Sequence, residues 1–160
     1  MKPSPLELQI ASLIDKYTAP VAVELRTARR HLQALFPRGC ELVFDNYNAL
    51  VFAFGPGERA TDALVSVAAY PKWITLFFRY GAKLQDPERL LQGAGSEVRS
   101  IRLSSSAQLS DPKVVALIAQ SVLPHGSAFE AAPPLRTLLK SISAKQRPRR
   151  PALHPGSVKL

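Results

Sequence analysis

The sequence predicts a single α+β domain, with a pair of N-terminal helices packed against an antiparallel sheet of five or six strands and with further short helices. Three observations support this fold class. Apolar residues recur at helical spacing in residues 1–36, and short runs rich in Val, Phe and Tyr follow between residues 41 and 80. The dipeptide Asp-Pro then occurs twice in positions suited to starting a helix. A chain of 160 residues, 46% of them hydrophobic, suits one core.

The first 36 residues predict two helices separated by the sequence YTAP. Thr18 can cap the second helix, Pro20 is tolerated in its first turn, and Pro37 and Gly39 end it. The apolar stripe of the first helix comprises Leu6, Ile10, Leu13, Ile14 and Tyr17, and that of the second comprises Val21, Leu25, Ala28, Leu32 and Leu35.

Four runs, at residues 41–45, 48–54, 63–70 and 73–80, predict an antiparallel meander, because turn residues separate them. The run 73–80 is apolar at both alternating sets of positions, so we expect it to lie centrally in the sheet. Residues 97–103 predict a fifth strand.

Two helices are predicted to begin at Asp86-Pro87 and at Asp111-Pro112. Residues 125–134 have the composition of a linker. Residues 135–143 match the spacing of a helix and of a strand equally well, and they complete the predicted domain, which spans residues 1–143. Residues 144–160 are rich in proline and cations and predict a flexible, solvated tail.

The charge is concentrated near the end of the chain. Residues 1–129 carry 14 Lys/Arg against 11 Asp/Glu, whereas residues 130–160 carry 7 against 1. The body of the protein is therefore nearly balanced, and the overall net charge of +9 does not by itself indicate a basic binding face. Cys40 is the single cysteine, and we find neither a signal peptide nor a membrane span. These features predict a soluble cytoplasmic protein.

The sequence contains no complete catalytic motif, so we expect a protein that is not an enzyme. His31, His125 and His154 lie far apart, and Cys40 has no partner at metal-ligand spacing, which argues against a metal site. Gly93 precedes a predicted strand rather than a helix, which suits a turn better than a phosphate-binding loop. No cofactor is predicted.

A candidate ligand site lies in the sequence FDNYNAL. Asp45, Tyr47 and Asn48 separate two apolar strands, and a polar rim above aromatic side chains is typical of small-ligand sites. Trp73 and Phe77 would form the floor of this pocket. The remaining rim residues would be Tyr70, Lys72 and Arg79, with either cation available to an anionic ligand. The alternative interpretation of FDNYNAL is a tight hairpin turn.

The cations of the tail predict a second site. Four of them, Lys145, Arg147, Arg149 and Arg150, could each neutralise a phosphate and so bind nucleic acid weakly and without sequence preference. No aromatic residue is interleaved with them, so base stacking is not indicated. The alternative is a solvated end that keeps the domain soluble.

Three segments together resemble the YdhG-like family, a bacterial domain family largely without assigned function: LVFDNYNALVFAFGPGERATDALVSVAAYPKWITLFF, LQDPERLLQGAGSEVRSIRL and KSISAKQRPRRP. The resemblance runs from about Leu13 to Pro151, and AAYPKWITLFF and LLQGAGSEVRSIRL are its most specific parts. It implies an antiparallel sheet packed by helices, likened to frataxin, with a strand at residues 135–143. FDNYNAL replaces the Tyr-Gly-x-Pro turn of the family, which suggests a subgroup with a different ligand.

Three hypotheses for the function follow. The first is a non-catalytic module that binds a small molecule or a protein partner. The second is association with nucleic acid or another polyanion through the tail. The third comes from the resemblance alone, since some family members are described as frataxin-like iron chaperones. Iron binding of that kind relies on a dense acidic surface, whereas the predicted helical pair contributes only Glu7, Asp15 and Glu24.

Overall fold

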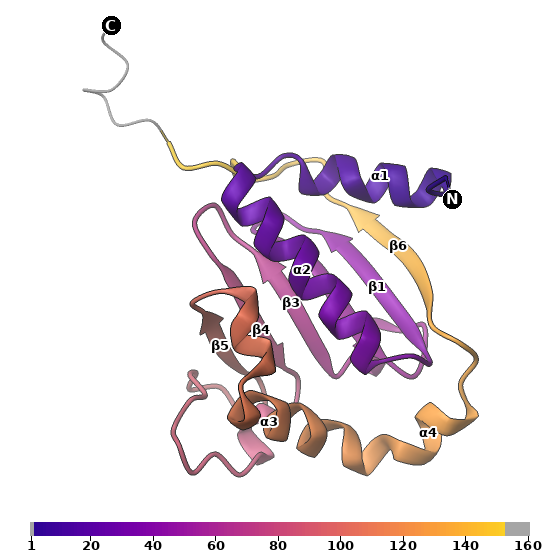
Figure 1. Ribbon diagram of the computed structural model, residues 1–160, viewed down its shortest axis with the longest axis vertical. Helices are drawn as coiled ribbons and strands as arrows, with labels where there is room; N and C mark the ends of the chain where they lie inside the picture. Colours follow the sequence, from indigo (N-terminus) through magenta and orange to yellow (C-terminus); the bar gives the residue numbers. More distant parts are fainter. Residues whose placement is uncertain (1, 153–160) are drawn as a thin grey trace, which may run out of the picture.

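A computed structural model describes residues 2–152 and confirms the α+β class (Figure 1). These residues form a six-stranded sheet whose strands lie in the order β5-β4-β3-β2-β1-β6. The strands are β1 (Cys40–Asp45), β2 (Leu50–Gly55), β3 (Val65–Ala69), β4 (Ile74–Phe78), β5 (Arg99–Leu103) and β6 (Arg136–Ile142). The predicted meander is confirmed from β1 to β5, in which each strand pairs antiparallel with the next.

The sheet is mixed, whereas an antiparallel sheet was predicted, because β6 pairs with β1 in parallel. After β5 the chain leaves one edge of the sheet and passes through α3 (Pro112–Val122) and α4 (Gly126–Ala131) to the opposite edge. It then enters β6 from the same end at which β1 begins (Figure 1). Parallel neighbours need a crossover of this length, so the direction of β6 follows from the helices that precede it. The strand interpretation of residues 135–143 is confirmed.

The predicted helical pair is confirmed as α1 (Pro5–Ile14) and α2 (Ala19–Leu35). The Ser4 hydroxyl caps α1 by accepting a hydrogen bond from the Glu7 amide at 3.1 Å. Leu35, predicted on the apolar stripe of α2, is 41% exposed, and Phe36 is buried in its place. The helix ends here, so the backbone turns Phe36 toward the core and Leu35 toward solvent.

Two further predictions were wrong in detail. Asp111 caps α3 as expected, but Asp86 does not begin a helix. Its carboxylate instead accepts hydrogen bonds from the amides of Leu90 and Leu91, which closes a turn in which Arg89 has a φ of 53°. The predicted linker at residues 125–134 contains α4.

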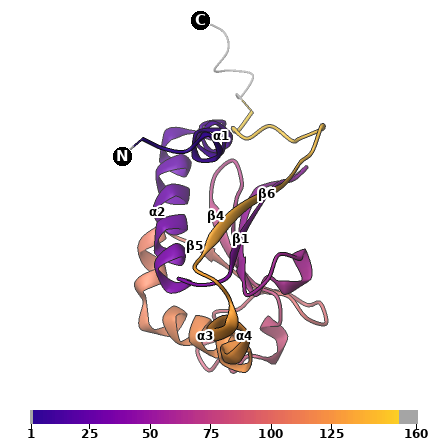
Figure 2. The ribbon, with the colours of Figure 1, turned by 90° about the vertical axis from the view of Figure 1, so that its right-hand side faces the viewer.

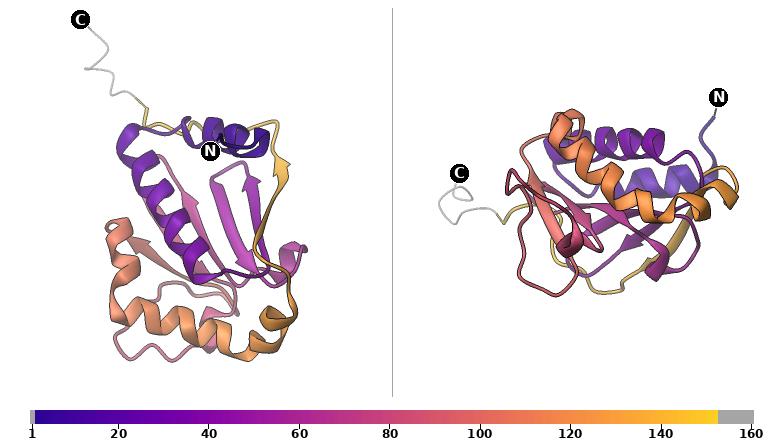
Figure 3. Two further views of the ribbon diagram at one scale, coloured as in Figure 1. Left: turned by 45° about the vertical axis from the view of Figure 1, so that its right-hand side comes forward. Right: turned by 90° about the horizontal axis from the view of Figure 1, so that it is seen from below.

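The main core lies between the helices and one face of the sheet, which we call the inner face. Along β2 and β4 the inner-face residues Leu50, Phe52, Phe54, Ile74, Leu76 and Phe78 are fully buried or nearly so. Figure 2 and Figure 3 show α1, α2 and α3 on this side of the sheet. The opposite, outer face has only a small cluster of its own, around Leu42 and Ala53. Among the described residues, no helix has the length and apolar character needed to cross a bilayer.

The predicted solvated tail implies that the chain leaves the domain after Ala144. In the structure it stays on the domain. The segment of residues 143–152, here called the C-terminal strap, runs beside α1 across the end of the sheet (Figure 1). The amide of Ser143 donates to Asp45 and that of Arg147 donates to Tyr47, each to the backbone carbonyl at 2.8 Å. Residues 153–160, the rest of the predicted tail, lie outside the described residues.

Candidate ligand-binding site

The largest hollow described lies between the C-terminal strap and the turn that joins β3 to β4. It has a volume of about 760 Å³, and we call it the Trp73 hollow. Its polar and aromatic lining comprises Asn48 from the β1–β2 turn, Tyr70, Lys72 and Trp73 from the β3–β4 turn, and Arg147 and Arg150 from the strap. The hollow therefore joins four residues of the predicted ligand site to two of the predicted polyanion-binding cations.

The β3–β4 turn presents the two rings of this hollow. The Tyr70 amide donates to the Trp73 carbonyl at 2.9 Å, which closes a tight turn with Pro71 and Lys72 at its tip. The ring centroids of Tyr70 and Trp73 are 6.2 Å apart. The guanidinium of Arg102, from the neighbouring strand β5, lies 3.6 Å from the Trp73 ring centroid. Such a cation–π contact holds the indole ring in place. Burial raises the pKa of Tyr70, so this phenol stays neutral at physiological pH.

A buried ion cluster holds the strap side of the hollow. The carboxylate of Asp45 is fully buried and accepts hydrogen bonds from Arg149 and Lys16 at 2.9 Å and from Gln146 at 2.8 Å. Burial alone would raise the pKa of Asp45, but these hydrogen bonds outweigh it and hold the pKa below its usual value. Arg149 also donates to the carbonyl of Tyr47. The β1–β2 turn and the strap are therefore joined through one carboxylate.

The strap is also attached to the junction between α1 and α2. Arg150 donates to the backbone carbonyls of Lys16 and Tyr17, at 3.1 and 2.9 Å. The Tyr17 hydroxyl, which is buried, donates to the Ala69 carbonyl at 2.8 Å and accepts from the Leu50 amide at 3.1 Å. Because Ala69 is the last residue of β3, these contacts connect the strap to the strand that leads into the Trp73 turn.

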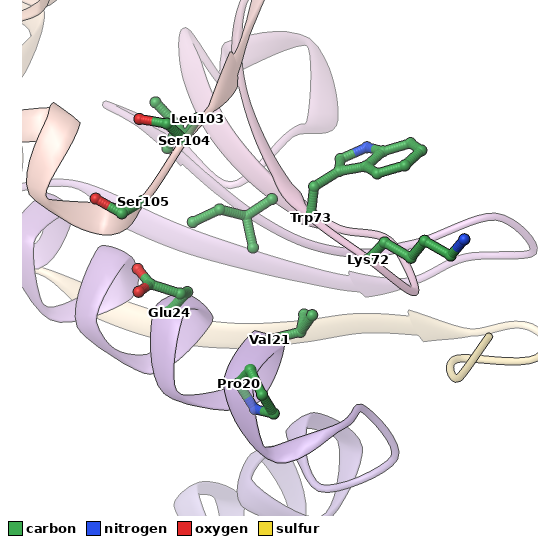
Figure 4. A pocket seen from close by; sticks show the side chains of 9 residues that line it. Pro20, Val21, Glu24, Lys72, Trp73, Leu103, Ser104 and Ser105 are labelled. Atoms are coloured by element: carbon green, nitrogen blue, oxygen red, sulfur yellow. The ribbon is translucent and has the colours of Figure 1, made fainter.

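A smaller hollow of about 130 Å³ lies on the other side of Trp73, between α2 and the end of β5 (Figure 4). Lys72 and Glu24 stand on opposite sides of it, and the Lys72 side chain extends away from Glu24. The Glu24 carboxylate accepts a hydrogen bond from the Ser106 amide, and this contact lowers its pKa. Glu24 is therefore engaged within the domain and does not neutralise Lys72.

Phe77 and Arg79 were predicted to share a pocket with Trp73, but the structure places them in a different hollow. This hollow has a volume of about 260 Å³ and lies on the outer face, where its apolar lining also includes Phe44 and Val51. We call it the Phe77 hollow. Alternation places Phe77 on the same face as Trp73, but four residues of extended chain separate their Cα atoms by about 13 Å, so the two rings line different hollows.

The remaining predicted residues differ in exposure. Asp45 lies beneath the strap and does not line the Trp73 hollow. Tyr47 is 50% exposed, and the Arg147 guanidinium lies 5.6 Å from its ring centroid. Lys145 is exposed. Arg149 was predicted to bind a polyanion. In the structure it is 5% exposed and paired with Asp45, so it is not available for that role.

Sequence reasoning did not identify Lys16, Gln146 or Arg102. The alternation of residues 97–103 gives a signal for Arg102, because Ile101 and Leu103 face the core and Arg102 must then face outward. No local pattern relates Lys16 or Gln146 to Asp45, from which they are separated by 29 and 101 residues.

The acidic residues of the helical pair are engaged by cations or by backbone. Glu7 accepts two hydrogen bonds from Arg29, and Asp15 pairs with Arg26. In the part of the chain that the structure describes, no three His, Cys, Asp or Glu residues gather closely enough to hold a metal ion.

No known family model matches this chain, and neither curated proteins nor solved structures give a significant match. The resemblance to the YdhG-like family, with its frataxin-like arrangement, therefore stays a prediction from the sequence.

Proposed function

We propose that this protein is a non-catalytic binding module and that its ligand is a small anion carrying a planar ring, bound in the Trp73 hollow. One observation carries the proposal: two aromatic rings and three cations line the same hollow. Lys72, Arg147 and Arg150 supply the charge, and Tyr70 and Trp73 supply the rings. Such a combination suits a ligand with one charged end and one flat apolar end.

The charge of the hollow is not neutralised within the described residues. None of its three cations forms an ion pair with a described carboxylate, and no described lining residue is acidic. Arg150 donates hydrogen bonds to two backbone carbonyls, but these contacts leave its positive charge unbalanced. An anion entering the hollow would therefore gain charge-assisted hydrogen bonds without displacing a protein carboxylate.

Binding rather than catalysis is the better supported function. Within residues 2–152 the lining of the hollow includes no His, Cys, Asp or Glu that could act as a general base, and the pKa of Tyr70 is raised. The proposal therefore assigns these residues to holding a ligand.

Trp73 is the single tryptophan of the chain, so its fluorescence reports directly on the hollow. The probe is adenosine monophosphate, with adenosine lacking the charge and inorganic phosphate lacking the ring. We expect saturable quenching by the monophosphate, and weaker binding of both fragments. The double variant Lys72→Ala/Arg147→Ala should bind the monophosphate at least tenfold more weakly, since two charge-assisted contacts are lost.

The matched control for this titration is Arg30→Ala/Lys113→Ala, which removes one Arg and one Lys from exposed positions outside the hollow. It should bind like the unmodified protein. Equal affinity for the monophosphate in the unmodified protein, in Lys72→Ala/Arg147→Ala and in the control would exclude the proposed site. Native mass spectrometry of protein purified from its own host would give the mass of any retained ligand.

Polyanion association through the tail is a second candidate, supported by the exposed positions of Lys145 and Arg147. Its test must leave Arg149 in place, because deleting the strap would leave the buried carboxylate of Asp45 without that partner. The variant Lys145→Ala/Arg147→Ala should elute from heparin at lower salt than the Arg30→Ala/Lys113→Ala control. Identical elution would exclude this candidate.

A further inference from the structure

Trp73, which directly precedes β4, lines the Trp73 hollow, and Phe77 of β4 lines the Phe77 hollow. Trp73 and Phe77 belong to the same set of alternating positions, and four residues of extended strand separate their Cα atoms by about 13 Å. Between them, Thr75 lies opposite Ala68 of β3 and Arg102 of β5. Phe77 itself lies opposite Ser66 and Ser100, whose side chains are small. Each hollow thus contains an aromatic ring. Between the two rings lie the exposed Arg102 and the small side chains of Thr75 and Ala68, which are 7% and 1% exposed.

The outer face of this sheet is basic. Glu41 and Asp45 are the carboxylates within the six described strands, and both are fully buried on the inner face in ion pairs. The outer face carries the exposed Arg102 of β5, and Arg79 follows directly after β4. A chain of negative charges crossing this face would therefore pass cations without meeting a strand carboxylate.

Arg79 adds an independent indication of a ligand. It lines the Phe77 hollow, and its Nε atom is buried without a hydrogen-bond partner among the described residues. A buried donor without a partner costs free energy, which an acceptor entering the hollow would recover. The guanidinium lies 5.4 Å from the ring centroid of Tyr80 and is thereby held near the hollow.

We propose that the Trp73 hollow and the outer face of β4 form one groove for single-stranded nucleic acid. Trp73 and Phe77 would stack bases, while Arg79 and Arg102 would contact phosphates along the strand. Aromatic side chains on an open sheet, flanked by cations, bind single strands because unpaired bases expose their faces. A duplex keeps those faces stacked internally, so it cannot use the two rings. The proposal rests on the proposed function, since it assigns the ligand of the Trp73 hollow to one end of a longer molecule.

The test is fluorescence anisotropy with a labelled oligouridylate, the corresponding oligothymidylate and a duplex of equal length. We expect saturable binding of single strands and much weaker binding of the duplex, with the comparison of uridylate and thymidylate distinguishing RNA from DNA. The variant Arg79→Gln/Arg102→Gln should reduce the salt dependence, with a slope smaller by about 1.4, because each phosphate contact on a single strand contributes about 0.7.

Two substitutions at Phe77 separate stacking from folding. Phe77→Ala should weaken oligonucleotide binding on the order of tenfold, as expected when one stacked base is lost, whereas Phe77→Tyr keeps the ring and should bind normally. Arg30→Ala/Lys113→Ala serves as the charge control and should leave the salt dependence unchanged. Thermal denaturation of each variant checks that the fold is retained.

The outcomes distinguish this proposal from the small-ligand proposal. Duplex binding equal to that of single strands, or an unchanged salt slope in Arg79→Gln/Arg102→Gln, would overturn the groove. Neither result would affect adenosine monophosphate binding in the Trp73 hollow. Conversely, if the monophosphate fails to quench Trp73 while the oligonucleotide binds and depends on Phe77, the small-ligand proposal fails and the groove stands.

Discussion

The guanidinium of Arg149 donates to the carboxylate of Asp45 at 2.9 Å, and the two side chains are 4% and 0% exposed. This contact joins the C-terminal strap to the β1–β2 turn across 104 residues of sequence. It also places Arg147 and Arg150, on either side of Arg149, where they line the Trp73 hollow. The pair therefore fixes the position of the strap relative to the β1–β2 turn. Removing one partner would leave the other charge buried without compensation.

We predict that Arg149→Ala destabilises the protein by about 3 kcal/mol, the lower end of the range for a broken buried pair, since Lys16 and Gln146 still contact Asp45. Chemical denaturation measures this free energy of unfolding. Arg136→Ala is the matched control, because its ion pair with Glu58 is half exposed and should contribute about 1 kcal/mol or less. Equal stability losses in the two variants would contradict a buried role for Arg149.

Asp45 should make the protein sensitive to acid. Hydrogen bonds lower the pKa of Asp45 in the folded protein despite burial. As the pH falls below about 4, the Asp45 carboxylate is therefore protonated in the unfolded state before it is protonated in the folded state. The stability due to Asp45 is therefore complete above that pH and is lost as the pH falls through the folded pKa. We predict that Asp45→Asn, though less stable at neutral pH, shows a shallower loss of unfolding free energy on acidification.

Part of the acid sensitivity should remain in Asp45→Asn, because the pKa values of Glu24 and Asp62 are also lowered. Asp62→Asn provides the comparison, since its partner Arg59 is exposed and their pairing is screened by solvent. A slope as steep in Asp45→Asn as in the unmodified protein would show that Asp45 does not titrate as argued.

Tyr17→Phe should destabilise the protein by about 1–3 kcal/mol, because it leaves a buried donor and a buried acceptor without a partner. The Tyr17 hydroxyl accepts from the Leu50 amide and donates to the Ala69 carbonyl, and these two residues are paired at the end of the β2–β3 ladder. Thermal and chemical denaturation measure the loss. Tyr47→Phe removes a hydroxyl from an exposed ring and should change stability by less than about 0.5 kcal/mol.

Glu41→Gln should cost about 3–5 kcal/mol, the range expected when a buried pair loses one charge. Glu41 is fully buried on β1 and accepts hydrogen bonds from Arg29 on α2, Gln33 and Thr137 on β6. Its removal would therefore loosen α2 and β6 from the sheet together. Hydrogen exchange should show faster exchange in β6 of Glu41→Gln, whereas Asp15→Asn, which breaks an exposed pair, should leave β6 protected.

The two N-terminal helices, the meander from β1 to β5 and the start of α3 could be predicted from local sequence patterns. Each depends on local periodicity or on a cap adjacent in sequence, such as Asp111 with the Lys113 amide. The faces of β4 were also predictable, because alternation separates Trp73 and Phe77 from Ile74 and Leu76.

Contacts between distant parts of the chain, which no local sequence pattern contains, set the direction of β6 and the position of the strap. β6 pairs with a strand about a hundred residues earlier, and the buried neighbour of Arg149 lies equally far away. The cationic, proline-rich composition of this segment predicts exposure to solvent. Composition contains no information about a buried carboxylate elsewhere in the chain that could pair with one of its cations. Asp45 provides that partner, and the resulting ion pair converts the predicted free tail into one wall of the Trp73 hollow.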